Sequence, residues 1–98
     1  MPIERHYALQ AANAREYLLE TALADLAATV NKLEGCLGAR VLRRSGNSQH
    51  FLFVETWANA AAYEGARGKL PKGAFDAVLA AIVGSPNIEK YEQAFSAL

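Results

Sequence analysis

The chain has 98 residues, 52% of them hydrophobic, and its 10 basic and 10 acidic side chains balance to a formal net charge of zero. This length predicts one domain over residues 1–98 with a single modest core, and the neutral charge argues against nucleic-acid or anionic-membrane partners. The lone cysteine, Cys36, cannot form a disulfide within the chain and no apolar run could span a bilayer, so we expect a cytoplasmic protein.

Residues 3–11 are expected to form a strand, along which side chains alternate between two faces. Four positions fall on each face: Ile3, Arg5, Tyr7 and Leu9 on one, and Glu4, His6, Ala8 and Gln10 on the other. His6 is a candidate general base if its face looks at the helices, because histidine titrates near neutral pH. Otherwise His6 is a strand residue with ordinary structural contacts.

A long amphipathic helix is predicted next. Asn13 suits a helix N-cap, because Glu16 follows at the spacing of a capping box. Apolar residues then recur at steps of four and three: Leu19, Leu23, Leu26, Val30 and Leu33. Gly35 is expected to end this helix in the left-handed conformation.

A hairpin is predicted over residues 36–57, with its turn at residues 45–48. In its second strand Phe51, Phe53, Glu55 and Trp57 share one face, and Leu52, Val54 and Thr56 share the other. His50 begins this strand beside the turn and is expected to be exposed. Cys36 begins the first strand and is interpreted as a small buried apolar residue.

Two short helices and a strand complete the chain. Asn59 is placed to cap an alanine-rich helix that reaches about residue 67, and Pro71 suits the first turn of the next helix. That second helix is expected to bury Phe75, Val78, Leu79 and Ile82. Residues 87–95 have the pattern of a final strand, with Tyr91 and Phe95 on one face.

The order of these elements predicts an α+β fold of the ferredoxin-like βαββαβ type with an antiparallel sheet. Helices of so small a chain cover only one sheet face. The strand at 50–57 is apolar on both faces, so the second face needs a cover as well. A second copy of the chain is the simplest cover, and we therefore expect a homodimer formed through the sheet face.

Several segments resemble the antibiotic biosynthesis monooxygenase domain: Leu33-Glu34-Gly35-Cys36-Leu37-Gly38, Val41-Leu42-Arg43, the run from Phe51 to Trp57, and Ala62-Tyr63. The resemblance covers nearly the whole chain and implies a dimeric α+β barrel. Members of this family include cofactor-independent oxygenases of aromatic polyketides, quinol oxygenases and haem-degrading oxygenases.

The chain departs from many members of that family at one place. They have a histidine in the helix after the tryptophan, whereas counting from Trp57 places Ala66 there. The haem-degrading branch also uses an asparagine on the first strand, and residues 3–11 contain none. Because alanine cannot ligate iron, a haem-degrading role is disfavoured.

Three aromatic residues are candidates for substrate binding. Trp57 is either a core or interface residue or the wall of an apolar pocket, and the resemblance implies substrate contact at this place. Phe53 lies on the same strand face. Tyr63 either packs with its hydroxyl toward solvent or hydrogen-bonds a substrate carbonyl or phenolate.

Glu55 shares a face with aromatic residues, so its carboxyl must be paired or protonated. A structural partner such as Arg40 across the hairpin, or a backbone N–H, is one interpretation; a general base of raised pKa is the other. The sequence lacks Cys/His metal spacing, a phosphate-binding loop and a nicotinamide or flavin fingerprint, so we expect neither a metal nor a cofactor.

The favoured hypothesis is a cofactor-independent monooxygenase that acts on an apolar aromatic, phenolic or quinol-type small molecule. Trp57, Tyr63 and Phe53 would hold the ring, and His6 would take the proton. Two alternatives remain: a non-catalytic binding or regulatory module, and an isomerase of a small polar metabolite. The lining of the pocket discriminates between these alternatives.

Overall fold

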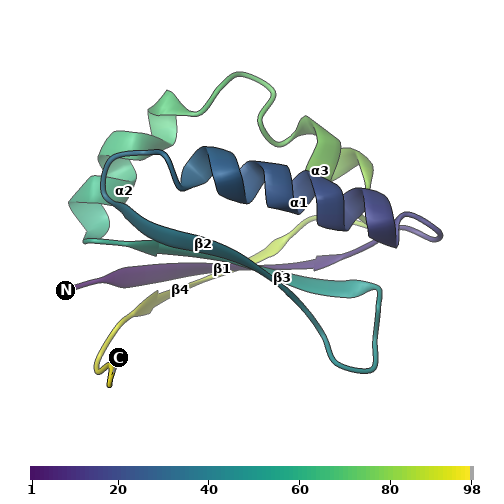
Figure 1. The fold of residues 1–98 in the computed structure, drawn as a ribbon, viewed down its shortest axis with the longest axis horizontal. Coiled ribbons are helices and arrows are strands. Elements are labelled where there is room, and N and C mark those ends of the chain that lie inside the picture. The colour runs from purple at the N-terminus through teal and green to yellow at the C-terminus, as the bar shows by residue number, and fades with distance from the viewer. Residues whose placement is uncertain (98) are drawn as a thin grey trace.

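The computed structural model describes residues 1–97 as a four-stranded antiparallel sheet covered on one face by helices (Figure 1). The strand order is β2-β3-β1-β4. The strands are β1 (Ile3–Gln10), β2 (Cys36–Arg43), β3 (His50–Trp57) and β4 (Asn87–Glu92). The helical segments are α1 (Glu16–Val30), α2 (Ala60–Ala66), the 3₁₀ turn η1 (Arg67–Lys69) and α3 (Asp76–Ala80). The predicted ferredoxin-like α+β fold is confirmed.

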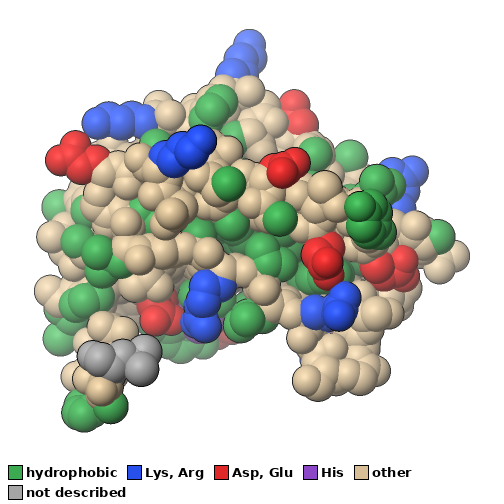
Figure 2. Space-filling view, viewed as in Figure 1, with side chains coloured by type: hydrophobic (Ala, Val, Ile, Leu, Met, Phe, Trp, Pro, Cys, Tyr) green, Lys and Arg blue, Asp and Glu red, His purple; other side chains and the backbone are tan. Residues whose placement is uncertain are grey.

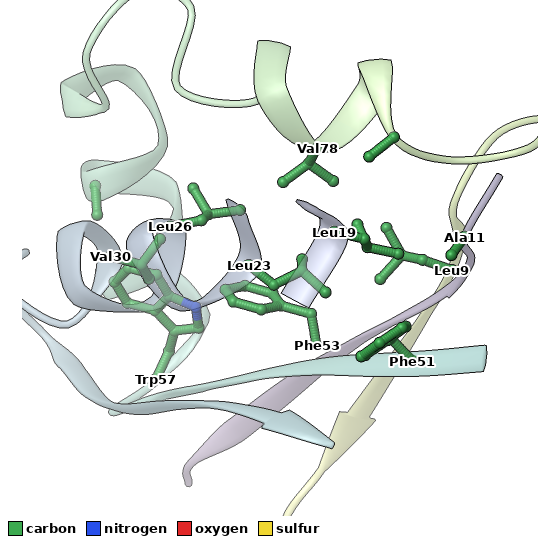
Figure 3. Close-up of a cluster of buried hydrophobic side chains, with 12 residues drawn as sticks. Leu9, Ala11, Leu19, Leu23, Leu26, Val30, Phe51, Phe53, Trp57 and Val78 are labelled. Atoms are coloured by element: carbon green, nitrogen blue, oxygen red, sulfur yellow. The ribbon is translucent and has the colours of Figure 1, made fainter. Parts of the chain in front are cut away.

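The core lies between α1 and the helix-side face of the sheet (Figure 3). In β3 the predicted alternation is confirmed, since Phe51, Phe53 and Trp57 belong to the core cluster and Val54 does not, and Glu55 borders a helix-side cavity together with Trp57. The α1 stripe packs on them through Leu19, Leu23, Leu26 and Val30. Burying each large apolar side chain is worth about 1.5–3 kcal/mol, so this layer of contacts supplies most of what holds α1 to the sheet.

The opposite sheet face has no helix over it, and we call it the open face. Val54 lies on this face between His6 and Arg40, its register neighbours on β1 and β2, and is 1% exposed. Leu42 pairs with Leu52 on the same face. Figure 2 shows the side of the molecule that faces the viewer in Figure 1, where hydrophobic side chains are interspersed with charged ones.

The start of α1 differs from the prediction. The helix begins at Glu16 with Arg15 at the N-cap position, and no side chain caps it. Ala14 has a φ of 64°, so the backbone turns just before the helix. Asn13 therefore lies outside the helix, and the predicted capping box is wrong.

The turn after α1 holds a close contact with α2. The helix ends at Val30, so Gly35 does not terminate it as predicted, although its φ of 87° is left-handed. A Cβ on Gly35 would stand 2.6 Å from the Cβ of Ala62. The predicted Asn59 cap is confirmed, because its side chain accepts a 2.8 Å hydrogen bond from the Ala62 N–H. The turn and the first residues of α2 are thus fixed against each other.

The C-terminal third is less helical than predicted. Pro71 lies in a turn and α3 begins only at Asp76. A five-residue helix cannot bury four positions, and of the expected stripe Phe75 and Leu79 are exposed. Strand β4 ends at Glu92, so Phe95 lies beyond it. Within residues 1–97, none of the helices combines the length and the apolar character needed to cross a membrane.

Candidate functional site

Two adjoining cavities lie between the sheet and the helices, with volumes of about 320 and 190 Å³. They share Tyr7, Tyr63 and Phe75 in their linings, so we treat them as one site, the helix-side site. The larger cavity is apolar apart from Arg5 and the two tyrosine hydroxyls. A small-molecule site of this kind is mostly apolar, with a few placed polar groups that fix orientation.

A chain of hydrogen bonds converges on Glu55 in this site. The Arg5 Nε–H donates to the Tyr7 hydroxyl oxygen at 3.0 Å, and the Tyr7 hydroxyl donates to Glu55 Oε1 at 3.0 Å. The Trp57 Nε1–H donates to the same carboxylate oxygen at 3.2 Å. Glu55 is 3% exposed and borders the smaller cavity, so a buried carboxylate adjoins the space available to a ligand.

Burial raises the pKa of Glu55 above its ordinary value of 4.5, because a dry environment disfavours the charged carboxylate. The hydrogen bonds from Trp57 and Tyr7 and the charge of Arg5 oppose that rise. Burial also raises the pKa of the Tyr7 phenol, so this hydroxyl stays protonated and donates. A carboxylate whose pKa is raised, and which two hydrogen-bond donors hold in place, is suited to accept a proton from a ligand.

The partner predicted for Glu55 across the hairpin is wrong. The residue opposite Glu55 on β2 is Ala39, and Arg40 pairs in register with Val54. Neighbouring residues of a strand point to opposite faces, so Arg40 belongs to the open face. Tyr7 and Trp57 satisfy the carboxylate instead.

Aromatic rings form the walls of the site. The Trp57 and Tyr63 rings meet edge to face with centroids 5.7 Å apart, and Tyr7 and Phe53 are tilted at 5.7 Å. Figure 3 shows Trp57 and Phe53 projecting from β3 toward α1. The structure therefore brings Phe53, Glu55, Trp57 and Tyr63 together, all of which the sequence singled out.

His6 lies elsewhere. Its Nε2 is 2.8 Å from Glu4 Oε1, and its ring centroid is 4.7 Å from that of Tyr91 on β4. Its register partner, Val54, belongs to the open face. The condition on which His6 would join the pocket, a face turned to the helices, is not met.

His50 also differs from expectation, because it is half-buried rather than exposed. It borders a third cavity of about 490 Å³ near the hairpin turn, together with Arg43 and Arg44. Its Nδ1 is buried and has no hydrogen-bond partner within residues 1–97. None of the residues assigned to chemistry in the helix-side site reaches this cavity.

Arg5 and Tyr7 are site residues to which the sequence analysis gave no role. They share one strand face with Leu9, and the only sign of their role in the sequence is an arginine among apolar neighbours. Ala66 is buried and lines the smaller cavity, but its methyl group offers no lone pair to a metal. Residues 1–97 hold no cluster of three or more His, Cys, Asp or Glu that could bind a metal ion.

The comparisons with known proteins agree with this fold. The family model described as antibiotic biosynthesis monooxygenase matches residues 3–82. A variant of SnoaB, a cofactor-independent oxygenase from Streptomyces nogalater, has a TM-score of 0.80 at 16% identity, covering 98% of this chain and 96% of that chain. No curated protein matches the sequence.

Two further solved structures share the fold. Rv0793 from Mycobacterium tuberculosis has a TM-score of 0.84 at 11% identity, with 100% of each chain covered. PA3566 from Pseudomonas aeruginosa has a TM-score of 0.78 at 24% identity, with 95% of each chain covered. At these identities the structural likeness establishes the fold alone.

Proposed function

Because the chain belongs to the antibiotic biosynthesis monooxygenase family, we propose that it is a cofactor-independent monooxygenase of an apolar aromatic, phenolic or quinol-type small molecule. The observation that carries this proposal is a buried carboxylate of raised pKa, Glu55, beside a cavity walled by aromatic rings. The similar fold of SnoaB, itself a cofactor-independent oxygenase, supports the reaction class.

The rings of Trp57, Tyr63 and Phe53 hold the flat substrate, and Glu55 takes the proton in place of His6. The first step is transfer of a proton from an activated ring methylene to the Glu55 carboxylate, which leaves a carbanion conjugated with the rings. The dry cavity and fixed hydrogen bonds favour this delocalised anion over its hydrated form.

The substrate anion then supplies the electrons that reduce O₂. One electron passes to O₂, the resulting radicals combine into a C–O bond, and the peroxide anion recovers the proton held by Glu55. Loss of water from the hydroperoxide turns the methylene into a carbonyl. One oxygen atom of O₂ enters the product and the other leaves as water, so no external reductant is required.

The composition of the site favours this reaction over the two alternatives. An isomerase of a polar metabolite needs several convergent polar groups, whereas the larger cavity is lined chiefly by aliphatic and aromatic side chains. A pure binding module needs no titratable group in its pocket, whereas Glu55 borders the smaller cavity.

Oxygen uptake with a panel of anthrones and quinols tests the proposal. We expect uptake by the unaltered protein, a loss of about 10²–10⁴-fold in Glu55→Gln, and a clear loss in Trp57→Ala and Tyr63→Phe. Tyr91→Phe is the matched control, because it removes an exposed hydroxyl on β4, which hydrogen-bonds Glu89 outside the site. Absence of uptake with every substrate, or full uptake in Glu55→Gln, would contradict the proposal.

We also propose that residues 1–98 act as one cytoplasmic domain that pairs with a second copy through the open face. Leu42 and Leu52 support this pairing, since they pair with each other on the face that has no helix over it. Membership of this family is a second support for pairing.

A further inference from the structure

We infer that the ligand of the helix-side site carries a negatively charged oxygen on its aromatic skeleton, and that the Arg5 guanidinium binds this oxygen. The inference deepens the proposed function and rests on it, because it concerns the substrate of the same site. It identifies the substrate class as an aromatic anion, such as a phenolate, enolate or carboxylate, rather than a neutral hydrocarbon ring system.

Arg5 is a buried cation that forms no direct ion pair with a carboxylate of residues 1–97. Its residue is 9% exposed, yet the ion pairs within residues 1–97 are His6–Glu4, Arg43–Glu20 and Arg67–Glu64, and none includes it. Its only hydrogen bond within those residues runs from Nε to the neutral Tyr7 hydroxyl. Burial of Arg5 is offset by the Tyr7 hydroxyl, the two tyrosine rings and the charge of Glu55, so the site retains a cation. A bound oxyanion would give this cation the paired, hydrogen-bonded partner that buried charges favour.

The guanidinium of Arg5 lies over the tyrosine rings that help to wall the larger cavity. Arg5 borders the larger cavity, and its Cζ lies 4.2 Å from the centroid of the Tyr63 ring and 5.5 Å from that of Tyr7. Stacking on Tyr63 fixes the plane of the guanidinium. Nη1 and Nη2 make no hydrogen bond within residues 1–97, and this planar pair of donors matches an oxyanion.

Glu55 does not serve as the missing partner. Arg5 and Glu55 stand opposite each other in the β1–β3 register, but the Tyr7 hydroxyl connects them and no direct ion pair forms. When Glu55 accepts a proton it becomes neutral, and the charge of Arg5 is then balanced by the substrate anion alone. The proton acceptor and the anion-binding group are thus separate residues of one hydrogen-bond chain.

Ligand binding without turnover tests the inference. Trp57 is the only tryptophan of the chain and borders the smaller cavity, so quenching of its fluorescence reports occupancy. The probes are anthraquinone-2-carboxylate and its neutral amide, which have the same ring system. We expect the carboxylate to bind about 10- to 100-fold more tightly, as charge-assisted hydrogen bonds do.

Variants assign the preference to one side chain. Arg5→Met retains the apolar stem and should bind both probes with similar affinity, and Arg5→Lys should retain part of the preference. Arg43→Met is the matched control, because Arg43 is paired with Glu20 and borders neither cavity of the helix-side site, and it should leave the preference intact. Circular dichroism confirms that each variant is folded.

Three outcomes would overturn the inference: equal affinities of the unaltered protein for both probes, a preference that survives in Arg5→Met, or no quenching by either probe at millimolar concentration. Selective binding of the carboxylate without oxygen uptake from any anthrone or quinol would support the inference and contradict the monooxygenase proposal instead. Oxygen uptake without selective binding of the carboxylate would support the monooxygenase proposal and contradict the inference about Arg5.

Discussion

The Tyr7 hydroxyl donates a 3.0 Å hydrogen bond to Oε1 of Glu55, which lies 48 positions later in the chain. The bond crosses from β1 to β3, the two inner strands of the sheet. The pairing of those strands therefore decides which phenol meets the carboxylate, and a shift of one residue would turn Tyr7 to the open face. The properties of Glu55 follow from this pairing.

Replacing Tyr7 by phenylalanine should raise the pKa of Glu55 further. The lost hydrogen bond favours the charged carboxylate, while burial, the larger effect, remains. A ¹³C NMR titration of the glutamate side-chain carboxyls measures this directly. Tyr91→Phe, whose hydroxyl contacts Glu89, is the control and should leave Glu55 unchanged. An unchanged or lowered Glu55 pKa in Tyr7→Phe would contradict the prediction.

Glu55 should make the protein less stable as the pH rises through a window that begins near 4.5. Its pKa is raised above that value in the folded state, so within this window the folded state binds more protons than the unfolded state. Stability then falls with rising pH. Glu55→Gln does not titrate, so the free energy of unfolding of the unaltered protein minus that of the variant should decrease as the pH rises. Urea unfolding at a series of pH values measures it, and a difference that grows with pH would refute it.

Gly35→Ala should destabilise the protein more than Gly46→Ala. Both glycines have positive φ, 87° and 76°, so a Cβ at either costs about 1–2 kcal/mol. At Gly35 the new Cβ would also meet the Cβ of Ala62 at 2.6 Å, whereas at Gly46 it meets nothing within 4 Å. We expect an additional loss of about 1–3 kcal/mol at Gly35, by analogy with overpacked cores. Equal losses in urea unfolding would show that the turn and α2 adjust freely.

Leu52→Glu should convert a dimer into folded single chains. Leu52 lies on the open face opposite Leu42, and a charge there opposes burial against a second copy. Leu18→Glu is the control, because Leu18 is an exposed apolar residue of α1. Light scattering coupled to size exclusion gives the mass. A single-chain mass for the unaltered protein at micromolar concentration would contradict the proposed pairing.

The β-strands were predictable because their signals are local. The alternation in β3 places Phe53 and Val54 on opposite faces, and in the structure Phe53 belongs to the core under α1 whereas Val54 does not. Helix ends were less predictable. The φ of 64° at Ala14 and the short α3 depend on how the connections pack over the sheet, and no residue type nearby indicates either.

The aromatic part of the site was predictable, since Phe53, Trp57 and Tyr63 belong to two consecutive elements. The polar part was not, because it depends on contacts between distant segments. The sequence shows that Arg5 and Tyr7 share a strand face, but only the pairing of β1 with β3 places both beside Glu55. For the same reason the side of the sheet on which His6 lies could not be decided from the sequence.

Every polar group of the helix-side site except the Tyr63 hydroxyl and the Arg67 guanidinium stands on β1 or β3. Each of these strands is hydrogen-bonded to a neighbour on both edges. Such backbone exchanges its amide protons only in rare, large openings. Local opening of β1 and β3 therefore gives no route for a ligand to enter the site. We therefore expect that the ligand enters past the short segments α2, η1 and α3, and that these segments limit its size. Relatives that accept bulkier molecules are expected to differ in these segments while retaining β1 and β3.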